Sequence, residues 1–457
     1  MHLSVVEKVF FAATVRTLSE SSRYHVIPYQ SLKYGVHHSK TDQAMRLTIP
    51  YGKDDKQFLN LPEENFAGKI YPKDVEVGDE RAELRRALDR PVAGPSLEKF
   101  LEGGKDIVFI VNDGTRPTPT CKVLDALAER MDLTNARYLI ATGDHRAPTE
   151  GEYRFIFGKH LEKLRPNIHS HSSRNDPCVF LGTSKNGTEM LVNEMAVNAD
   201  RLVIITSVEP HYFAGYTGGR KSFLPGVAAR KTIEQNHKLA MKQEAQALVL
   251  EGNPVHEDMM DALKVVKDKP IFAIQIVLDR HQNIYKVEAG DLHESFAHAV
   301  KWANEVFSVK IKEKAEIVVS IAPYPMDVDL YQSQKALDNG KWALKEGGTI
   351  IMVSKCREGI GHDTFLQQLS LSEDPRKVLE NLAKEYKLGY HKAAKMAEIA
   401  VWADVWAVTD LDPELLKKAN IRPFATVQEA VDAALAKNKD AKVLINMDGS
   451  ITVPRVG

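Results

Sequence analysis

Apolar and polar positions follow a repeating order through most of this chain. An apolar run of strand length precedes a polar loop, and a segment with helical spacing follows the loop. This order occurs at residues 106–131, 136–160 and 201–238, and again at 315–354. Strands that alternate with helices in this way predict a parallel β-sheet covered by helices.

The repeat predicts two such units. The apolar run at 270–279 and the segment at 291–309 close the first unit, and the lysine-rich segment at 310–315 is the expected junction. We therefore predict an α/β fold of two α/β domains with mainly parallel sheets and an active-site cleft between them. Residues 45–308 are expected to form the N-terminal domain, and residues 309–457 the C-terminal domain.

The beginning of the chain has a different pattern. Residues 1–44 show no regular alternation, and we expect them to be an extension outside the core. Residues 45–61 alternate with period two on both sides of a Gly and Asp turn. That alternation predicts a β-hairpin at the start of the folded region.

Composition and charge narrow the class of protein. The chain has 457 residues, of which 43% are hydrophobic and 27% charged, enough to bury the cores of two domains. A formal net charge of -1 gives no long-range attraction for nucleic acid or an anionic membrane. No apolar run reaches the roughly 18 to 20 residues that span a bilayer. The three cysteines are scattered singly, which favours free thiols in a reducing compartment. We expect a cytoplasmic protein.

The unusual loops all follow predicted strands. They lie at residues 113–116, 143–146, 209–221 and 323–335. In open α/β sheets, ligands bind beyond the carboxyl ends of the strands. We therefore expect the side chains of these loops to converge on one site.

The loop at 209–221 has the most unusual composition. Gly215, Gly218 and Gly219 allow positive φ angles and would let main-chain N–H groups approach an anion, while Lys221 adds a mobile ammonium. The spacing matches neither the Walker A loop nor the dinucleotide fingerprint. The alternative is a plain strand-to-helix turn with exposed basic side chains.

Three histidines accompany these loops. His145 and His211 follow strands directly, and imidazoles exchange protons near neutral pH, so the pair could serve opposite faces of one carbon. His237 lies in the helical segment after the glycine-rich loop, where a neutral imidazole could bind a metal. Each histidine taken alone also fits a structural role.

Two further groups could bind a ligand. Asp113, Thr115 and Arg116 combine an acceptor, a hydroxyl and a bidentate donor just before a helix that prolines begin. Taken alone they also fit a helix cap and an ion pair. Gln332 and Lys335 share one helix face, which suits a carboxylate ligand as well as it suits solvent.

Together these segments resemble the lactate racemase family over residues 45–457. The resemblance rests on NDGTRPTP, ATGDHR, EPHYFAGYTGGRKSFLPG, the NH of QNHK, and YQSQK, in the order expected for that family. It implies an isomerase that racemises or epimerises a 2-hydroxy acid by reversible hydride transfer. It also implies a nickel-pincer nucleotide, Ni(II)-pyridinium-3,5-bisthiocarboxylic acid mononucleotide, and enzymes that build this cofactor as partners for loading.

The resemblance implies a role for each candidate residue. Lys221 looks like the lysine that carries the nucleotide covalently, and His237 looks like the protein ligand to nickel. His145 and His211 look like the paired acid and base. The other matching positions are cofactor-binding Asp113, Gly114, Thr115 and Arg116, and substrate-binding Arg116, Gln332 and Lys335.

Two positions depart from the family pattern. Gly114 stands where several members have a larger polar residue, and His391 stands where lactate-acting members have tryptophan. These departures predict a roomier and more polar pocket, and hence a substrate larger or more polar than lactate.

Two other functions remain open at this point. A zinc-dependent hydrolase would bring His145, His211 and His237 together at one metal. A non-catalytic protein that binds a nucleotide or nickel would need no acid and base pair. Both are compatible with the residues of the loops considered one by one.

Overall fold

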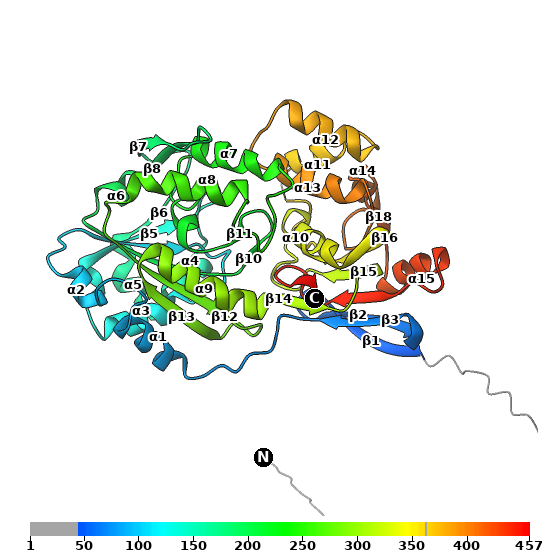
Figure 1. Ribbon diagram of the computed structural model, residues 1–457, viewed down its shortest axis with the longest axis horizontal. Coiled ribbons are helices and arrows are strands. Elements are labelled where there is room, and N and C mark those ends of the chain that lie inside the picture. Colours follow the sequence, from blue (N-terminus) through cyan, green and yellow to red (C-terminus); the bar gives the residue numbers. More distant parts are fainter. Residues whose placement is uncertain (1–43, 362) are drawn as a thin grey trace, which may run out of the picture. The chain divides into compact units, whose positions relative to one another are not determined.

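The structure is a computed structural model that describes residues 44–361 and 363–457 of the chain. Residues 1–43, which make up nearly all of the expected extension, lie outside the described residues. The described part contains two six-stranded sheets and four two-stranded sheets (Figure 1). Two α/β units with largely parallel sheets are therefore present, as the sequence predicts.

The first sheet contains the strands that precede the candidate loops. Its strand order is β13-β12-β9-β4-β5-β6. β13 runs antiparallel to β12, and the other neighbours are parallel. In spatial order the strands are β13 (Ile284–Gly290), β12 (Ile271–Leu278), β9 (Arg201–Ser207), β4 (Ile107–Asn112), β5 (Ala136–Ala141) and β6 (Ile168–Ser170).

Helices cover both faces of the first sheet because its strands are apolar on both sides. Phe109 and Val111 of β4 belong to a core with helices α1 to α5, whereas Val108 and Ile110 belong to a core with α6, α7 and α8. The helices are α1 (Glu80–Asp89), α2 (Leu97–Leu101), α3 (Thr120–Ala128), α4 (Glu150–Phe157), α5 (Leu161–Leu164), α6 (Glu194–Asn198), α7 (Arg230–Lys238), α8 (Pro254–Ala262) and α9 (Leu292–Phe307). We call this sheet and its helices the first lobe.

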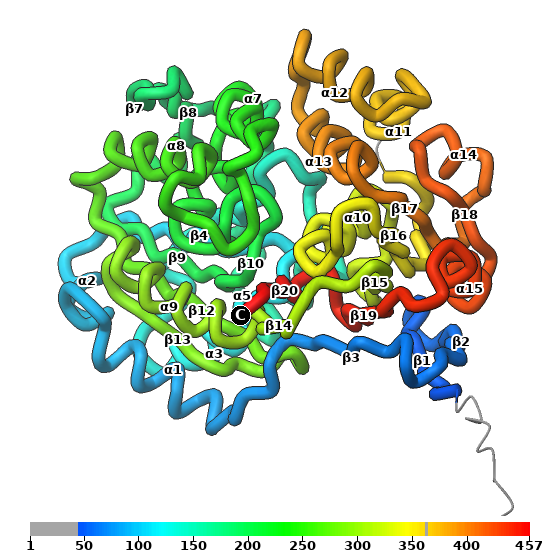
Figure 2. Tube along the Cα trace, turned by 45° about the vertical axis from the view of Figure 1, so that its right-hand side comes forward, coloured from blue at the N-terminus to red at the C-terminus, as the bar shows by residue number. Residues whose placement is uncertain are grey.

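The second sheet is parallel throughout, with strand order β18-β17-β16-β15-β19-β3. In spatial order the strands are β18 (Arg422–Phe424), β17 (Asp404–Val408), β16 (Leu344–Val353), β15 (Ala315–Ile321), β19 (Val443–Asn446) and β3 (Phe66–Ile70). The helices of this second lobe are α10 (Leu330–Gly340), α11 (Asp363–Leu369), α12 (Pro375–Lys384), α13 (Tyr390–Ala400), α14 (Pro413–Lys418) and α15 (Val427–Lys437). Figure 2 shows α13 close to α10.

The expected hairpin is present, but the structure places it with the second sheet. β1 (Ala44–Tyr51) and β2 (Asp55–Pro62) pair antiparallel. Apolar residues of both strands share a core with β15, β16 and α15, and β3 lies beside β19. The sequence prediction assigned this segment to the N-terminal domain. Local alternation shows that a strand forms, but it does not reveal which sheet a strand joins, and here the long-range pairing differs from the expectation.

The remaining strands form short two-stranded sheets. They are β7 (Cys178–Thr183) with β8 (Glu189–Asn193), β10 (Pro210–His211) with β11 (Gly215–Tyr216), and β14 (Ser308–Ile311) with β20 (Val453–Val456). The β10–β11 pair holds the glycine-rich loop in shape directly after β9. Among the described residues, no helix is both long and apolar enough to cross a bilayer.

Candidate active site

Asp113 and His145 meet at the carboxyl ends of the neighbouring strands β4 and β5. His145 Nδ1 lies 2.7 Å from Asp113 Oδ2, and the Thr115 hydroxyl donates to Asp113 Oδ1 at 2.7 Å. Asp113 is buried, whereas 45% of the His145 side chain is exposed. Because an ionised carboxylate can only accept, the proton of the neutral imidazole lies on Nδ1, and Nε2 is left as an acceptor.

The Asp113 carboxyl group is held in its charged form. Burial opposes its ionisation, but the hydrogen bond and charge of His145, with smaller contributions from Thr115 and Arg116, keep the pKa of Asp113 below its ordinary value. A charged Asp113 fixes the orientation of the His145 ring.

His211 has the opposite hydrogen-bonding arrangement. It is buried in β10, and the main-chain N–H of Ala214 donates to its Nδ1 at 3.3 Å. Burial, followed by the charges of Lys221 and Arg116, lowers the pKa of His211 well below its ordinary value, so the ring is neutral near pH 7. The proton of this neutral ring then lies on Nε2. The two imidazoles therefore present one acceptor nitrogen and one donor nitrogen.

The glycine-rich loop adopts the predicted backbone conformation but does not offer the predicted N–H groups. The φ angles of Gly215, Gly218 and Gly219 are 77°, 81° and 52°. The N–H of Gly215 donates to Gln246 O, and that of Gly219 donates to Gln275 Oε1. The expectation that these two N–H groups would bind an anion is wrong, because the protein itself satisfies them.

Arg220 holds this loop from inside. Its side chain is 1% exposed, and its guanidinium donates to the main-chain oxygens of Ala214, Tyr216 and Gly218. It also lies over the Phe296 ring, 4.4 Å from the centroid. Burial lowers the pKa of Arg220 to about 9. Arg220 thus fixes the backbone that presents the next residue.

Lys221 is that next residue, and no described carboxylate pairs with its amine. Nζ makes no hydrogen bond or ion pair with any described residue, and it lies 5.4 Å from the centroid of the Phe213 ring. Burial, then the charges of Arg116, Arg220 and Lys335, lower the pKa of Lys221 well below its ordinary value. A neutral amine in a desolvated site is a nucleophile.

His237 lies near Lys221, in the last turn of α7. Its ring packs edge-on against Phe213, with 5.0 Å between centroids, and lies 5.6 Å from the ring of His391. Its Nδ1 is buried and has no hydrogen-bond partner among the described residues. Burial, then His391 and Lys221, lower the pKa of His237 well below its ordinary value. A neutral imidazole with an unused ring nitrogen can act as a metal ligand.

Arg116 and Lys335 supply positive charge from the two lobes. Arg116 Nη1 lies 3.4 Å from Glu209 Oε1. Burial and the charge of Arg116 lower the pKa of Lys335 to about 8. Gln332 lies one turn before Lys335 on α10, and its side chain makes no hydrogen bond to a described residue. Both α10 side chains therefore remain available to a ligand.

The sequence reasoning missed Lys392 as part of this charged group. Its side chain is 5% exposed, its Nζ donates to Tyr331 O at 2.6 Å, and the charge of Lys335 contributes to lowering its pKa, after burial. A signal was present, because Lys392, Lys395, Met396 and Ile399 have the spacing of a buried helix face. Lysines at buried positions of a helix indicate a binding site for a negatively charged ligand.

The predicted space beside Gly114 is filled. A Cβ added to Gly114 would lie 2.5 Å from Glu152 Cγ. Glu152 accepts from Arg146 Nη1 at 2.7 Å and from the N–H of Thr149 at 2.6 Å, the second bond being part of the capping box of α4. The expectation of a roomier pocket at Gly114 is therefore wrong.

The zinc arrangement is not formed either. Within residues 44–361 and 363–457, no three His, Cys, Asp or Glu side chains lie close enough to share one metal ion. His145, His211 and His237 thus do not meet as a three-histidine zinc site, which the hydrolase hypothesis required.

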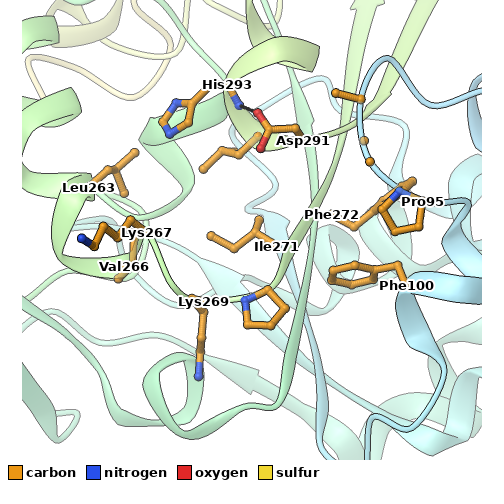
Figure 3. A pocket seen from close by; sticks show the side chains of 15 residues that line it. Pro95, Phe100, Leu263, Val266, Lys267, Lys269, Ile271, Phe272, Asp291 and His293 are labelled. Carbon is orange, nitrogen blue, oxygen red and sulfur yellow. Dashed lines mark hydrogen bonds between the residues drawn. The ribbon is translucent and has the colours of Figure 1, made fainter.

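A separate pocket lies at the amino ends of the strands of the first sheet, away from the candidate residues. It has a volume of about 270 Å³ and is lined by Phe100, Ile271, Phe272, Asp291 and His293, among others (Figure 3). Ile271 and Phe272 begin β12, so the pocket lies at the amino ends of the parallel strands. The candidate residues lie at the carboxyl ends, and the two sites are distinct.

Comparisons with known proteins identify the family of the chain. The model of the lactate racemase N-terminal domain matches residues 51–248, and the model of the lactate racemase C-terminal domain matches residues 310–453. A lactate racemase from Thermoanaerobacterium thermosaccharolyticum is 32% identical over 425 residues, covering 90% of this chain and 99% of that protein. A lactate racemase from Lactiplantibacillus plantarum is 31% identical over 420 residues, covering 88% and 98%.

Solved structures give the same result. The lactate racemase apoprotein from T. thermosaccharolyticum superposes with a TM-score of 0.82 at 32% identity, covering 90% of this chain and all of that chain. A protein from Thermotoga maritima, 16% identical with a TM-score of 0.64 and covering 84% of this chain, shares the fold. The chain is an isomerase of the racemase and epimerase type and belongs to the lactate racemase family.

Proposed function

We propose that this protein inverts C2 of a 2-hydroxy acid and uses a nickel-pincer nucleotide attached to Lys221. The observation that carries the proposal is the Lys221 amine, which is partly buried, forms no ion pair with any described residue and lies near the imidazole of His237. The relatives named lactate racemase support the reaction type. The described cysteines are free thiols, which suits a cytoplasmic protein that cofactor-building enzymes load.

The residues fit the proposed cofactor. Lys221 offers an amine for covalent attachment, and the buried Nδ1 of His237, which lacks a partner, marks an imidazole with ligand capacity to spare. One imidazole suffices where the cofactor brings its own sulfur donors. Asp113 to Arg116 would contact the nucleotide from the end of β4. When bound, the nickel-pincer nucleotide would accept and return the hydride of C2.

His145 and His211 would handle the hydroxyl proton. Nε2 of His145 can accept a proton, and the imidazolium that results is stabilised by Asp113. Nε2 of His211 carries the proton of a neutral ring and can donate it. One base and one acid allow the hydroxyl proton to leave on one face and return on the other, and the roles reverse for the opposite enantiomer.

Arg116 and Lys335 would hold the substrate carboxylate. Both contribute positive charge to the pocket that surrounds His211, and Glu209 takes up part of the charge of Arg116. A carboxylate placed between them would keep Lys335 protonated. Fixing the carboxylate from both lobes would orient C2 toward the acid and base pair.

His391 supports a substrate more polar than lactate. The Tyr386 hydroxyl lies 2.9 Å from His391 Nδ1, and burial, then Lys392 and Lys395, lower the pKa of His391 to about 3. The ring is therefore neutral. With Tyr386 donating to Nδ1, the ring proton lies on Nε2 and can be donated to an acceptor on the substrate.

The first prediction concerns attachment at Lys221. Protein made alongside the cofactor-building enzymes should carry a nucleotide adduct in its intact mass, and Lys221→Ala should lose the adduct entirely because no amine remains to form the bond. Lys231→Ala, which changes an exposed lysine of α7, is the control and should keep the adduct. An adduct that survives Lys221→Ala would remove the assignment.

The second prediction concerns the acid and base pair. His145→Ala and His211→Ala should each lower kcat/KM of racemisation by about 10²–10⁴-fold, because either change removes a proton-transfer group. The adduct mass should persist in both variants. His169→Ala, at a half-exposed histidine paired with Asp176, should match the unmodified enzyme. A fully active His145→Ala enzyme would contradict the two-histidine scheme.

The third prediction concerns pH. Lys335 has a lowered pKa of about 8 and binds the carboxylate only when protonated. The value of kcat/KM should therefore be highest below pH 8 and decrease as the pH rises through 8. Lys335→Arg should move this decline to higher pH because arginine keeps its proton. The check is the pH profile of kcat/KM for both enzymes. A decline that Lys335→Arg leaves in place would assign it to another group.

The fourth prediction concerns substrate choice. Loaded enzyme should racemise acids with a polar side chain better than lactate, and His391→Phe should remove that preference. A site that hydrogen-bonds a substrate group discriminates by about 10⁴ or more, against roughly 10 to 200 for an extra methylene. Polarimetry with lactate, malate, longer aliphatic hydroxy acids and aldonic acids measures this. Lactate with the highest kcat/KM would contradict it.

A further inference from the structure

A buried carboxylate joins three elements behind the active site. Asp258 of α8 is 0% exposed and forms no ion pair with any described residue. Its Oδ1 accepts from the Ser184 hydroxyl at 2.5 Å, and its Oδ2 accepts from the Thr188 hydroxyl at 2.7 Å and from Asn236 Nδ2 at 2.8 Å. A buried carboxylate is tolerated only where hydrogen bonds replace its lost water, and these three neutral donors do so.

The three donors come from two different segments. Ser184 and Thr188 belong to the turn between β7 and β8, and Asn236 belongs to the last turn of α7. Figure 1 shows this hairpin together with α7 and α8 in one part of the first lobe. Asp258 therefore fixes the end of α7 to its neighbours on both sides.

The end of α7 carries His237, directly after Asn236. Neither ring nitrogen of His237 makes a hydrogen bond to a described residue, although metal-binding histidines usually have one nitrogen oriented by such a bond. Packing on Phe213 and the placement of the helix end are what orient the ring. Phe213 also carries the Lys221 amine on its face, so a shift of α7 would separate His237 from Lys221.

We propose that Asp258 is a positioning residue for His237, acting through Asn236 to keep the imidazole beside the Lys221 amine. This proposal rests on the proposed function, in which His237 binds the nickel of a nucleotide attached to Lys221. Loss of the Asp258 hydrogen bonds would loosen the His237 ligand and leave the covalent attachment intact.

The experiment separates the metal from the adduct. Loaded enzyme is exposed to a chelator, and nickel per covalent adduct is followed by metal analysis and intact mass. Asp258→Asn should release nickel about 10–100-fold faster than the unmodified enzyme while the adduct mass persists. Asp261→Asn is the matched control, because Asp261 lies on the same helix and accepts from the N–H of Lys185 in the same turn but does not reach α7. It should retain nickel normally.

A second measurement needs no cofactor. In unloaded protein with isotope-labelled histidine, Asp258→Asn should shift the ring signals of His237 in the NMR spectrum and leave those of His145 unchanged. Thr188→Val removes one hydrogen-bond donor to Asp258 and should shift the His237 ring signals less, in the same direction. This variant tests the positioning role if Asp258→Asn does not fold. If the unmodified enzyme carries no adduct after production with the cofactor-building enzymes, the proposed function is wrong. The His237 ring signals would still test whether Asp258 positions His237. Normal nickel retention and unshifted His237 signals, even with a lower Tm, would overturn the positioning role.

Discussion

The removal of water from basic side chains is the constraint on which this site depends. Lys221, Lys335 and Lys392 are brought together with Arg116, and the carboxylates near Lys335 and Lys392 do not offset the loss of water. A buried ammonium without a partner is unfavourable, so the pKa of these amines is lowered and a larger fraction of them is neutral. The same environment favours an incoming anion, because a carboxylate would restore the missing counter-charge. Reactivity at Lys221 and affinity for an acid therefore have one physical origin.

Much of this arrangement could be predicted from the sequence because it depends on local patterns. The alternation of strand, loop and helix predicted two mainly parallel sheets, and the rule for the carboxyl ends of strands placed the loops at 113–116, 143–146 and 209–221 at one edge of the first sheet. The period-two segment at 45–61 formed a hairpin. Each of these features is decided by residues close together in the chain.

Other features depend on contacts between distant residues and could not be predicted. Glu152 fills the space beside Gly114 because Arg146 and the capping box of α4 hold it there. The N–H of Gly219 is taken by Gln275 of β12, more than fifty residues away. Sequence spacing indicates that a loop can bind an anion, but only the packed structure shows whether its donors are already occupied.

The position of β3 has a consequence for synthesis of the chain. Phe66–Ile70 pairs with Val443–Asn446. β3 is therefore synthesised early but can pair only after β19, near the end of the chain, has been synthesised. The first lobe can complete its sheet as soon as β13 has left the ribosome, whereas β1, β2 and β3 keep an apolar face and an open strand edge until β19 arrives. This early segment consequently exposes apolar surface and an unpaired strand edge during most of translation, which is when a chaperone would protect it.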